Sequence, residues 1–512
     1  MRGIAWLLAM TALACGSVKH EGGGVDGGGG GGDFALSAAP ESAFVRQGAS
    51  IDVEVTVDRQ GFAGDIEVTA GGLPSGVTAQ PLTIADGQDS GTLTLEAAGD
   101  ATQGEAAVSL TGEAADGTGG GDLRLLVGGD PGSYDQSFAD AGQFLDDFGI
   151  AMVAQRGAAL QPDGKIVGTG SSGDQAITYR LNRDGSVDDG FGTGGVVTTG
   201  IGTSTGGLVP LVLADARIVV AGWGGDVNPD PGYDSALFGY TADGELDGDF
   251  GSSGTVSLDL GEGYDEFHGL VQDQDGGLLP AGIEFAGGSS TLRRYDAQGV
   301  LDGAYVVAPV ASAGVQATIL QRDGKTVLVG AASGDFWLER HLETGELDDG
   351  FDNDGTATTD MGAAGDQAIG VVEIAAGKLV VAGLSGGTVA LARYNKNGSL
   401  DLTFGDGGKV VSAIELDTRG LNALAVDSQG RFLVAGFLSG PPRLPAVVRF
   451  TPDGDPDETF GEGGVVGLDF GVESGTQTTA FGVLIDPDDR IIVACDVGTP
   501  GAQQAGVARL WP

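Results

Sequence analysis

Arginine and aspartate side chains recur at fixed positions from residue 133 onward, and this pairing is the most regular chemistry in the sequence. A guanidinium fork binds a carboxylate through two hydrogen bonds, and burying either partner alone is costly. The spacing therefore predicts a structural ion pair in each repeat, since unit-by-unit repetition is typical of scaffolding and not of a ring of substrate ligands. Only the second unit departs, with Gly239 in place of arginine. The two sets are Asp135, Asp188, Asp247, Asp302, Asp348, Asp401 and Asp457, and Arg180, Arg294, Arg340, Arg393, Arg449 and Arg509.

Two acidic turns could bind a hard cation. Asp352 and Asp354 lie in one, and Asp453, Asp455 and Asp457 lie in the other, so that oxygens recur at alternate positions. Neither turn completes an EF-hand loop, and Asp-Gly is also what an ordinary hairpin turn uses. We expect plain turns, with weak calcium binding as the alternative and no other cofactor.

The sequence contains only weak matches to catalytic motifs. Segments 202–206 and 383–387 fit the G-x-S-x-G pattern, but that motif requires a strand-to-helix elbow and neither segment precedes a helical pattern. The only histidines are His20, His268 and His341, and they lack metal-ligand spacing. The sequence therefore predicts no catalytic residues.

The first residues resemble a bacterial lipoprotein signal. Arg2 precedes an apolar stretch too short to span a bilayer permanently, and residues 11–15 (TALAC) resemble a lipobox that ends at Cys15. The resemblance implies removal of residues 1–14 and lipidation of Cys15, with 15–33 as a Gly-rich tether; ordinary secretion with a free thiol is the alternative. We expect a protein anchored by lipid in the outer membrane of the cell envelope. Cys495, in an apolar strand, is expected to be inert and buried.

Charge limits the partners. The chain carries 72 acidic and 25 basic residues, a net charge of −47. Because nucleic-acid affinity depends on Lys and Arg displacing counterions, this excludes DNA and RNA. The 97 glycines favour short strands and tight turns over helices. We expect a monomer.

Residues 34–128 alternate apolar and polar side chains in the period of a β-strand, most clearly at 51–57. Several such segments separated by Gly, Asp and Pro turns predict a small β-sandwich. Segment 72–77 (GLPSGV) resembles bacterial Ig-like domains of exported proteins, which implies a spacer or adhesion module.

Residues 133–512 contain seven repeats. Each unit opens with x-x-Asp-x-x-Phe-Gly or a relative, continues through a hairpin whose turn is polar and Gly-bearing, most clearly at 160–167, and ends with an apolar strand such as 390–394. Four short strands per unit without helical periodicity predict one propeller blade per unit, and therefore an all-β, seven-bladed β-propeller. The units start at Ser133, Ser186, Glu245, Val300, Glu346, Ser399 and Asp455.

These motifs resemble the bacterial delta-sixty repeat, whose layout is similar to that of NHL blades. The resemblance covers the repeats and is weakest in the fourth unit, where 301–305 lacks Phe-Gly. It implies that the Asp-Phe-Gly segment is the outermost strand and that the strand before Asp-Gly lines the channel. The last blade would then borrow a strand from 133–145 to pair with 506–511, which removes an exposed edge.

We expect a non-catalytic lipoprotein that presents the propeller as a platform for a protein or polysaccharide ligand. The alternatives are a hydrolase or lyase that uses carboxylates at the channel end and a metal, and a calcium-dependent adhesin. A cluster of acids, histidines or aromatics that breaks the repeat symmetry at one mouth of the channel would favour an active or sugar-binding site.

Overall fold

The structure is a computed structural model, and it describes residues 34–115, 117–150, 154–226, 232–259, 263–284, 289–305, 307, 313–416, 424–438, 443–471, 478–499 and 501–512. The described residues are almost entirely strands and turns, with one short 3₁₀ helix, η1 (Ala375–Gly377). None of the described helices has the length and apolar character to cross a membrane.

The N-terminal part is a nine-stranded mixed sheet that curls on itself. Its alternating strands turn their apolar side chains to one core, which includes Val53, Val55, Leu95, Leu110 and Leu125. The predicted sandwich would have two separate sheets, whereas β1 pairs with both β3 and β9 and joins the two halves into one half-barrel. The strands are β1 (Phe34–Ala39), β2 (Ser42–Arg46), β3 (Ser50–Asp58), β4 (Ile66–Gly71), β5 (Val77–Ala79), β6 (Leu82–Ile84), β7 (Ser90–Ala97), β8 (Gly104–Ala114) and β9 (Gly117–Gly128).

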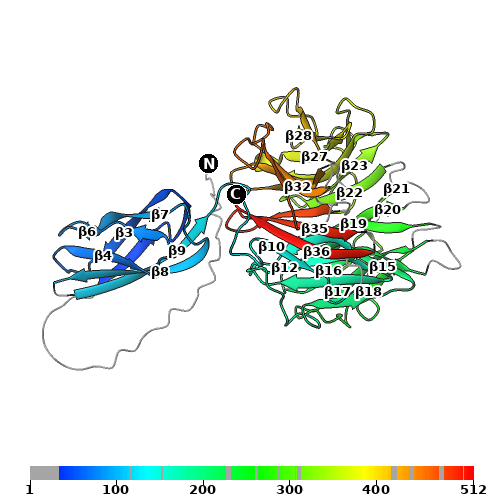
Figure 1. Ribbon diagram of the computed structural model, residues 1–512. Helices are drawn as coiled ribbons and strands as arrows, with labels where there is room; N and C mark the ends of the chain where they lie inside the picture. The colour runs from blue at the N-terminus through cyan, green and yellow to red at the C-terminus, as the bar shows by residue number, and fades with distance from the viewer. Residues whose placement is uncertain are drawn as a thin grey trace, which may run out of the picture.

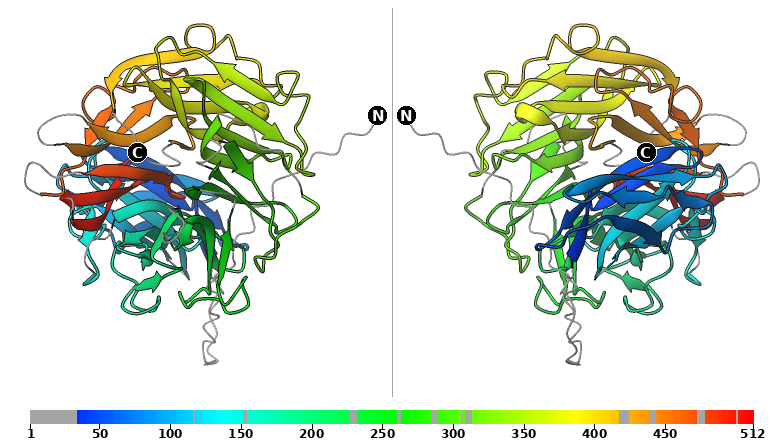
Figure 2. Two further views of the ribbon diagram at one scale, coloured as in Figure 1. Left: turned by 90° about the vertical axis from the view of Figure 1, so that its right-hand side faces the viewer. Right: turned by 90° about the vertical axis from the view of Figure 1, so that its left-hand side faces the viewer.

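Seven antiparallel sheets follow and form a β-propeller, as the repeats predict (Figures 1 and 2). Blades 1 to 3 are β11 (Ala154–Leu160), β12 (Ile166–Ser172), β13 (Gln175–Leu181) and β14 (Val196–Thr199); β15 (Ser204–Val212), β16 (Ile218–Gly225), β17 (Asp234–Tyr240) and β18 (Thr255–Leu258); and β19 (Asp265–Gln272), β20 (Leu278–Glu284) and β21 (Ser289–Leu292).

Blades 4 to 6 are β22 (Ala313–Leu320), β23 (Thr326–Ala332), β24 (Asp335–His341) and β25 (Thr356–Thr359); β26 (Gln367–Glu373), β27 (Leu379–Ser385), β28 (Thr388–Tyr394) and β29 (Lys409–Glu415); and β30 (Leu424–Val426), β31 (Phe432–Leu438), β32 (Leu444–Phe450) and β33 (Val465–Gly467). Blade 7 combines β34 (Thr479–Ile485), β35 (Ile491–Thr499) and β36 (Ala502–Leu510) with β10 (Gln143–Asp146).

The middle strands of each blade are apolar on both faces because another blade covers each face. In β27, for example, Leu379, Val380, Val381 and Ala382 are all buried. The first strands of successive blades contact one another around the ring, β11 also contacts β34, and these strands therefore line the central channel. This agrees with the prediction that the strand before the Asp-Gly turn is innermost.

The ring closes between the two ends of the repeat region. β10 pairs antiparallel with β36, from Gln143 opposite Ala508 to Asp146 opposite Ala505. The sequence predicts that the borrowed strand lies within 133–145 and that the Asp-Phe-Gly segment is itself that strand. That second expectation is wrong: Asp135 and Phe138 form a turn, in which the Phe138 N–H donates to the Asp135 carbonyl, and the outer strand begins afterwards.

The N-terminal sheet lies against one side of the ring (Figure 1). Arg124 at the end of that sheet donates two hydrogen bonds of 2.7 Å to Asp488, in the turn between β34 and β35. Trp511, which is fully buried, packs against Phe44 and donates to Gln103 at 2.9 Å. The N-terminal domain is therefore held to the ring by both charged and apolar contacts.

The antiparallel blades give the ring two distinct faces. Turns between first and second strands, such as the one that contains Asp488, lie on the face that meets the N-terminal sheet. Turns between second and third strands, and the connections from one blade to the next, lie on the opposite face (Figure 2). That opposite face is called the distal face below.

Candidate functional site

Each described first strand except β30 contains a register shift at one residue, and these residues differ from blade to blade. They are Arg156, Leu208, His268, Gln316, Ile369 and Phe481. A β-bulge leaves its extra residue outside the ladder and redirects the side chain, which is why bulges are common beside functional sites. The backbone of these strands is thus repeated from blade to blade, whereas the side chain at the bulge differs.

Five of the six bulge residues line one cavity of about 370 Å³, together with Trp223, Tyr233 and Glu266. The five come from five different first strands, so the cavity lies at the channel. Trp223 lies near the end of β16, the second strand of blade 2, and Tyr233 directly precedes β17, the third strand, so the cavity opens at the distal face. The sequence does not show which residues form such an asymmetric cluster.

A hydrogen-bonded chain runs along one wall of this channel pocket. The Tyr233 hydroxyl donates to one oxygen of Glu266, and the other oxygen lies 2.8 Å from His268 Nε2. His268 Nδ1 lies 2.8 Å from the Val315 carbonyl oxygen. Both ring nitrogens thus lie beside oxygens that can accept a hydrogen bond, the Val315 carbonyl and the Glu266 carboxylate.

The pKa of Glu266 reflects two opposing effects. Burial raises it, but the hydrogen bond and charge of His268 outweigh burial and hold the pKa below its ordinary value. The pKa of Tyr233 is raised, first by burial and then by the adjacent Glu266 carboxylate. Glu266 is therefore ionised and Tyr233 protonated at neutral pH.

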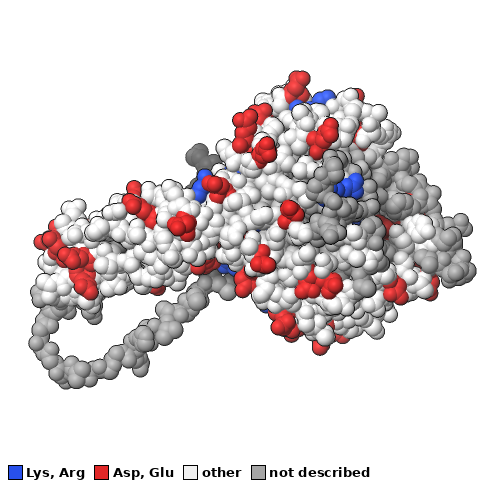
Figure 3. Space-filling model, in the orientation of Figure 1, with Lys and Arg blue, Asp and Glu red and all other residues white. Residues whose placement is uncertain are grey.

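Arg156 gives the pocket its remaining charge. Its guanidinium lies 4.9 Å from the centre of the Phe481 ring, and among the described residues it forms no ion pair. The charge of Arg156 lowers the pKa of two nearby acids, Glu266 and Asp496. Acidic side chains are spread over the surface of both the N-terminal sheet and the ring (Figure 3), as the net charge of −47 requires, whereas Arg156 places a positive charge in the lining of the pocket.

Aromatic rings form the outer wall. Trp223 and Tyr233 have ring centres 5.6 Å apart, and Tyr233 and the exposed Tyr264 have theirs 4.8 Å apart. Such rings offer large apolar faces with polar edges, which suits a flat or ring-shaped polar ligand.

The aspartates and arginines that recur in the sequence come together in pairs. Six Arg–Asp pairs have N···O distances of 2.6–3.1 Å: Arg180–Asp188, Arg294–Asp302, Arg340–Asp348, Arg393–Asp401, Arg449–Asp457 and Arg509–Asp135. Five of these arginines also stack on the phenylalanine of the repeat motif, at 4.3–4.6 Å from the ring centre. The motif therefore couples a carboxylate and an aromatic face to one guanidinium.

Blade 2 lacks the arginine but keeps an ion pair. A side chain at Gly239 would collide with Phe250, whose side-chain atoms come within 2.4–2.7 Å of an added Cβ. Instead Arg217, from the hairpin turn of the same blade, reaches Asp247 at 3.4 Å. Arg217 occupies the position of Lys165, which makes the equivalent contact to Asp188 in blade 1.

Two aspartates of the acidic turns bind other side chains or backbone groups of the protein. Asp354 accepts hydrogen bonds from the backbone and hydroxyl of Thr356, and Asp457 is engaged by Arg449 and Thr459. Asp352, Asp453 and Asp455 are exposed. None of the five belongs to a group of described carboxylates close enough to share one cation.

The two cysteines are unlike each other. Cys15 lies outside the described residues. Cys495 is fully buried in β35, and burial raises the pKa of its thiol well above the usual value, so it is unreactive as the sequence suggests.

Three segments, 161–191, 377–404 and 430–460, match a domain of unknown function described as the DUF5122 beta-propeller. No curated protein matches the chain. Among solved structures, virginiamycin B lyase from Staphylococcus aureus is 11% identical, with a TM-score of 0.43 over 72% of this chain and all of the lyase. Drosophila Semaphorin 1a is 9% identical, with a TM-score of 0.36 over 72% of this chain and 88% of the semaphorin chain.

Proposed function

We propose that this chain with DUF5122 propeller segments is an exported binding protein, and that the channel pocket holds a small polar ligand with a negative charge. The observation that carries the proposal is the bulge position, because a constant scaffold presents a different side chain in each blade at one point of the channel. Arg156 would bind the anionic group, and Trp223 and Tyr233 would pack against the body of the ligand.

A carbohydrate that carries a carboxylate, such as a uronic-acid oligosaccharide, combines these features. Its hydroxyls suit the polar groups of Gln316 and Glu266, and its ring faces suit the aromatic wall. This agrees with the expectation of a polysaccharide ligand and narrows it to an acidic one.

Fluorescence titration tests the proposal, because Trp223 lines the pocket whereas Trp337 and Trp511 are buried elsewhere. We expect a glucuronic-acid oligosaccharide to change the emission of the full chain and a matched glucose oligosaccharide to bind at least tenfold more weakly. Arg156→Gln should abolish that preference. Arg443→Gln is the matched control, since Arg443 also stacks on a phenylalanine, Phe437, but lies outside the pocket. Equal binding of the two sugars, or equal effects of the two variants, would refute the proposal.

A hydrolase or lyase is the second candidate, and the Tyr233–Glu266–His268 chain favours it because such groups can move protons. Binding ranks first because both nitrogens of His268 and both oxygens of Glu266 already have partners within the protein. Release of reducing ends from the same oligosaccharide, lost in Glu266→Gln, would favour catalysis instead.

The proposed location rests on the N-terminal sequence and on its resemblance to lipoproteins with delta-sixty repeats. Cys15 would carry the lipid, and residues 16–33 would tether the described domains to the outer membrane. The N-terminal domain contacts the face of the ring opposite the distal face. It would therefore leave the channel pocket accessible, because the pocket opens at the distal face.

A further inference from the structure

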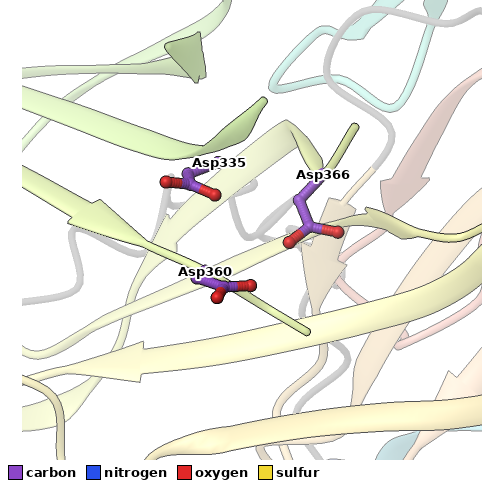
Figure 4. Close-up of side chains that lie close together, drawn as sticks. All are labelled: Asp335, Asp360 and Asp366. Carbon is purple, nitrogen blue, oxygen red and sulfur yellow. The ribbon is translucent and has the colours of Figure 1, made fainter. Parts of the chain in front are cut away.

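We propose that Asp335, Asp360 and Asp366 form a calcium-binding site where blade 4 passes into blade 5. Asp335 is the first residue of β24, Asp360 directly follows β25, and Asp366 directly precedes β26. One carboxylate oxygen from each lies within 4.8 Å of the others. Figure 4 shows the three side chains converging from three segments of the chain.

This separation suits a calcium ion. Ca²⁺ binds oxygens at roughly 2.3–2.6 Å, so two ligands on opposite sides of one ion are roughly 4.6–5.2 Å apart. Mg²⁺ requires shorter bonds of about 2.0–2.1 Å and a stricter octahedron, and it usually keeps several waters. Three acidic groups from separate segments therefore match the larger, more tolerant cation.

The state of Asp366 points to a ligand independently of the clustering. Its side chain is 1% exposed, and its Oδ2 accepts the Met361 N–H at 2.7 Å. Its Oδ1 is buried and has no hydrogen-bond partner among the described residues. A buried carboxylate oxygen without a partner is costly, and a cation at the point where the three groups meet would satisfy it.

The local backbone holds the three groups in place. The Asp366 N–H donates to the Gly334 carbonyl at 2.7 Å, which fixes it beside the turn that leads to Asp335. Asp360 accepts the Gly362 N–H at 2.7 Å. The one nearby cation with a described contact, Lys409, donates to the Asp360 main-chain oxygen at 3.0 Å. The three carboxylates thus repel one another with little compensation from the protein.

The same spacing occurs at a second junction. Asp335, Asp360 and Asp366 are separated by 25 and 6 residues, and so are Asp234, Asp259 and Asp265 between blades 2 and 3. The backbone contact is also repeated, since the Asp265 N–H donates to the Tyr233 carbonyl at 2.8 Å. Two junctions of this ring therefore carry the same three-aspartate pattern.

The test uses the full chain and Ca²⁺ itself, with bound ions counted by calorimetry and thermal melting followed with calcium or with EDTA. Calcium should raise Tm, with half-saturation at about 10⁻⁴–10⁻³ M, as in extracellular modules. Asp366→Asn and Asp360→Asn should each remove one bound ion. Asp352→Asn and Asp354→Asn, in an acidic turn outside the site, should leave the count unchanged.

The sign of the stability change separates a metal site from a structural cluster. In EDTA, Asp366→Asn should melt higher than the native chain, because it removes repulsion and keeps an oxygen for the Met361 N–H. In calcium it should melt lower than the native chain. An unchanged ion count in Asp366→Asn, a native Tm that calcium does not raise, or the same order of stability in both conditions would overturn the proposal.

Discussion

Removing the carboxylate of one blade's ion pair should destabilise the propeller far more than removing an exposed one. Arg449 in blade 6 is fully buried, and its pKa is lowered to about 10, chiefly by burial, so it is still charged at neutral pH. Its Nε donates to Asp457 at 2.8 Å, and one of its terminal nitrogens already lacks a partner. In Asp457→Asn the new amide keeps the shape of the side chain but leaves the guanidinium without its counter-charge.

The cost of stranding a buried charge in this way is about 3–5 kcal/mol. Each 1.4 kcal/mol is about a factor of ten, so the equilibrium between folded and unfolded chains should shift roughly 10²- to 10³-fold or more. Urea denaturation followed by circular dichroism measures this free energy of unfolding. Asp453→Asn, an exposed acid in the same turn, is the control and should change it by less than about 0.5 kcal/mol.

A double variant tests the physical reason. Asp457→Leu with Arg449→Met removes both charges, and such replacements are often neutral or stabilising, so stability should largely return. If Asp457→Asn and Asp453→Asn had equal effects, the ion pair would not be structural. If the double variant were as unstable as Asp457→Asn, the cost would lie in packing and not in the stranded charge.

Three further outcomes are expected. A chain beginning at residue 129 should melt cooperatively, whereas one beginning at 147 should aggregate or melt far lower, because it loses β10 and the partner of Arg509; identical melting would contradict the closure. Burial raises the pKa of Asp496 to about 7, so the folded chain keeps a proton that the unfolded chain loses near pH 4. Between those two pH values, the contribution of Asp496 to the free energy of unfolding therefore falls by about 1.4 kcal/mol for each unit by which the pH rises. Asp496→Asn should flatten that part of the pH–stability curve, and an unaltered curve would exclude this origin. Cys15→Ser should move the protein from the membrane fraction to the soluble fraction, and continued sedimentation with membranes would refute the anchor.

The repeat chemistry made the fold predictable from the sequence. The polar hairpin turns and the Asp-x-x-Phe segments perform the same local task in successive blades, so similar residues recur where the backbone recurs, although residues 301–305 lack Phe-Gly. The ion pairs follow from the same logic. The ion pair between Arg217 and Asp247, which takes the place of the pair that an arginine at position 239 would form, could not be predicted in this way. It joins two strands whose adjacency appears only in the folded blade.

The channel pocket could not be found in this way, because a binding site in a repeat protein consists of the residues that differ. Arg156, His268 and Phe481 occupy one column of the repeat, each followed by glycine, and the only signal is that this column changes its chemistry. The aspartates at 335, 360 and 366 are visible in the sequence only as a spacing that recurs at 234, 259 and 265. Its meaning depends on the passage from the outer strand of one blade to the inner strand of the next.

The contact between the first domain and Trp511, the residue before the last, gives the molecule a particular response to mechanical load. Tension applied at the N-terminus reaches the ring at residues 128–133, beside the strand that closes it. Gly128 and Gly129 pass so close to Trp511 that an added Cβ would lie about 3 Å from its ring. Tension at these residues acts on the paired strands β10 and β36 together. The hydrogen bonds between Arg124 and Asp488 transfer part of the force to blade 7. The two ends of the repeat region thus carry the force together, and we expect the ring to stay closed until the pairing of β10 with β36 breaks.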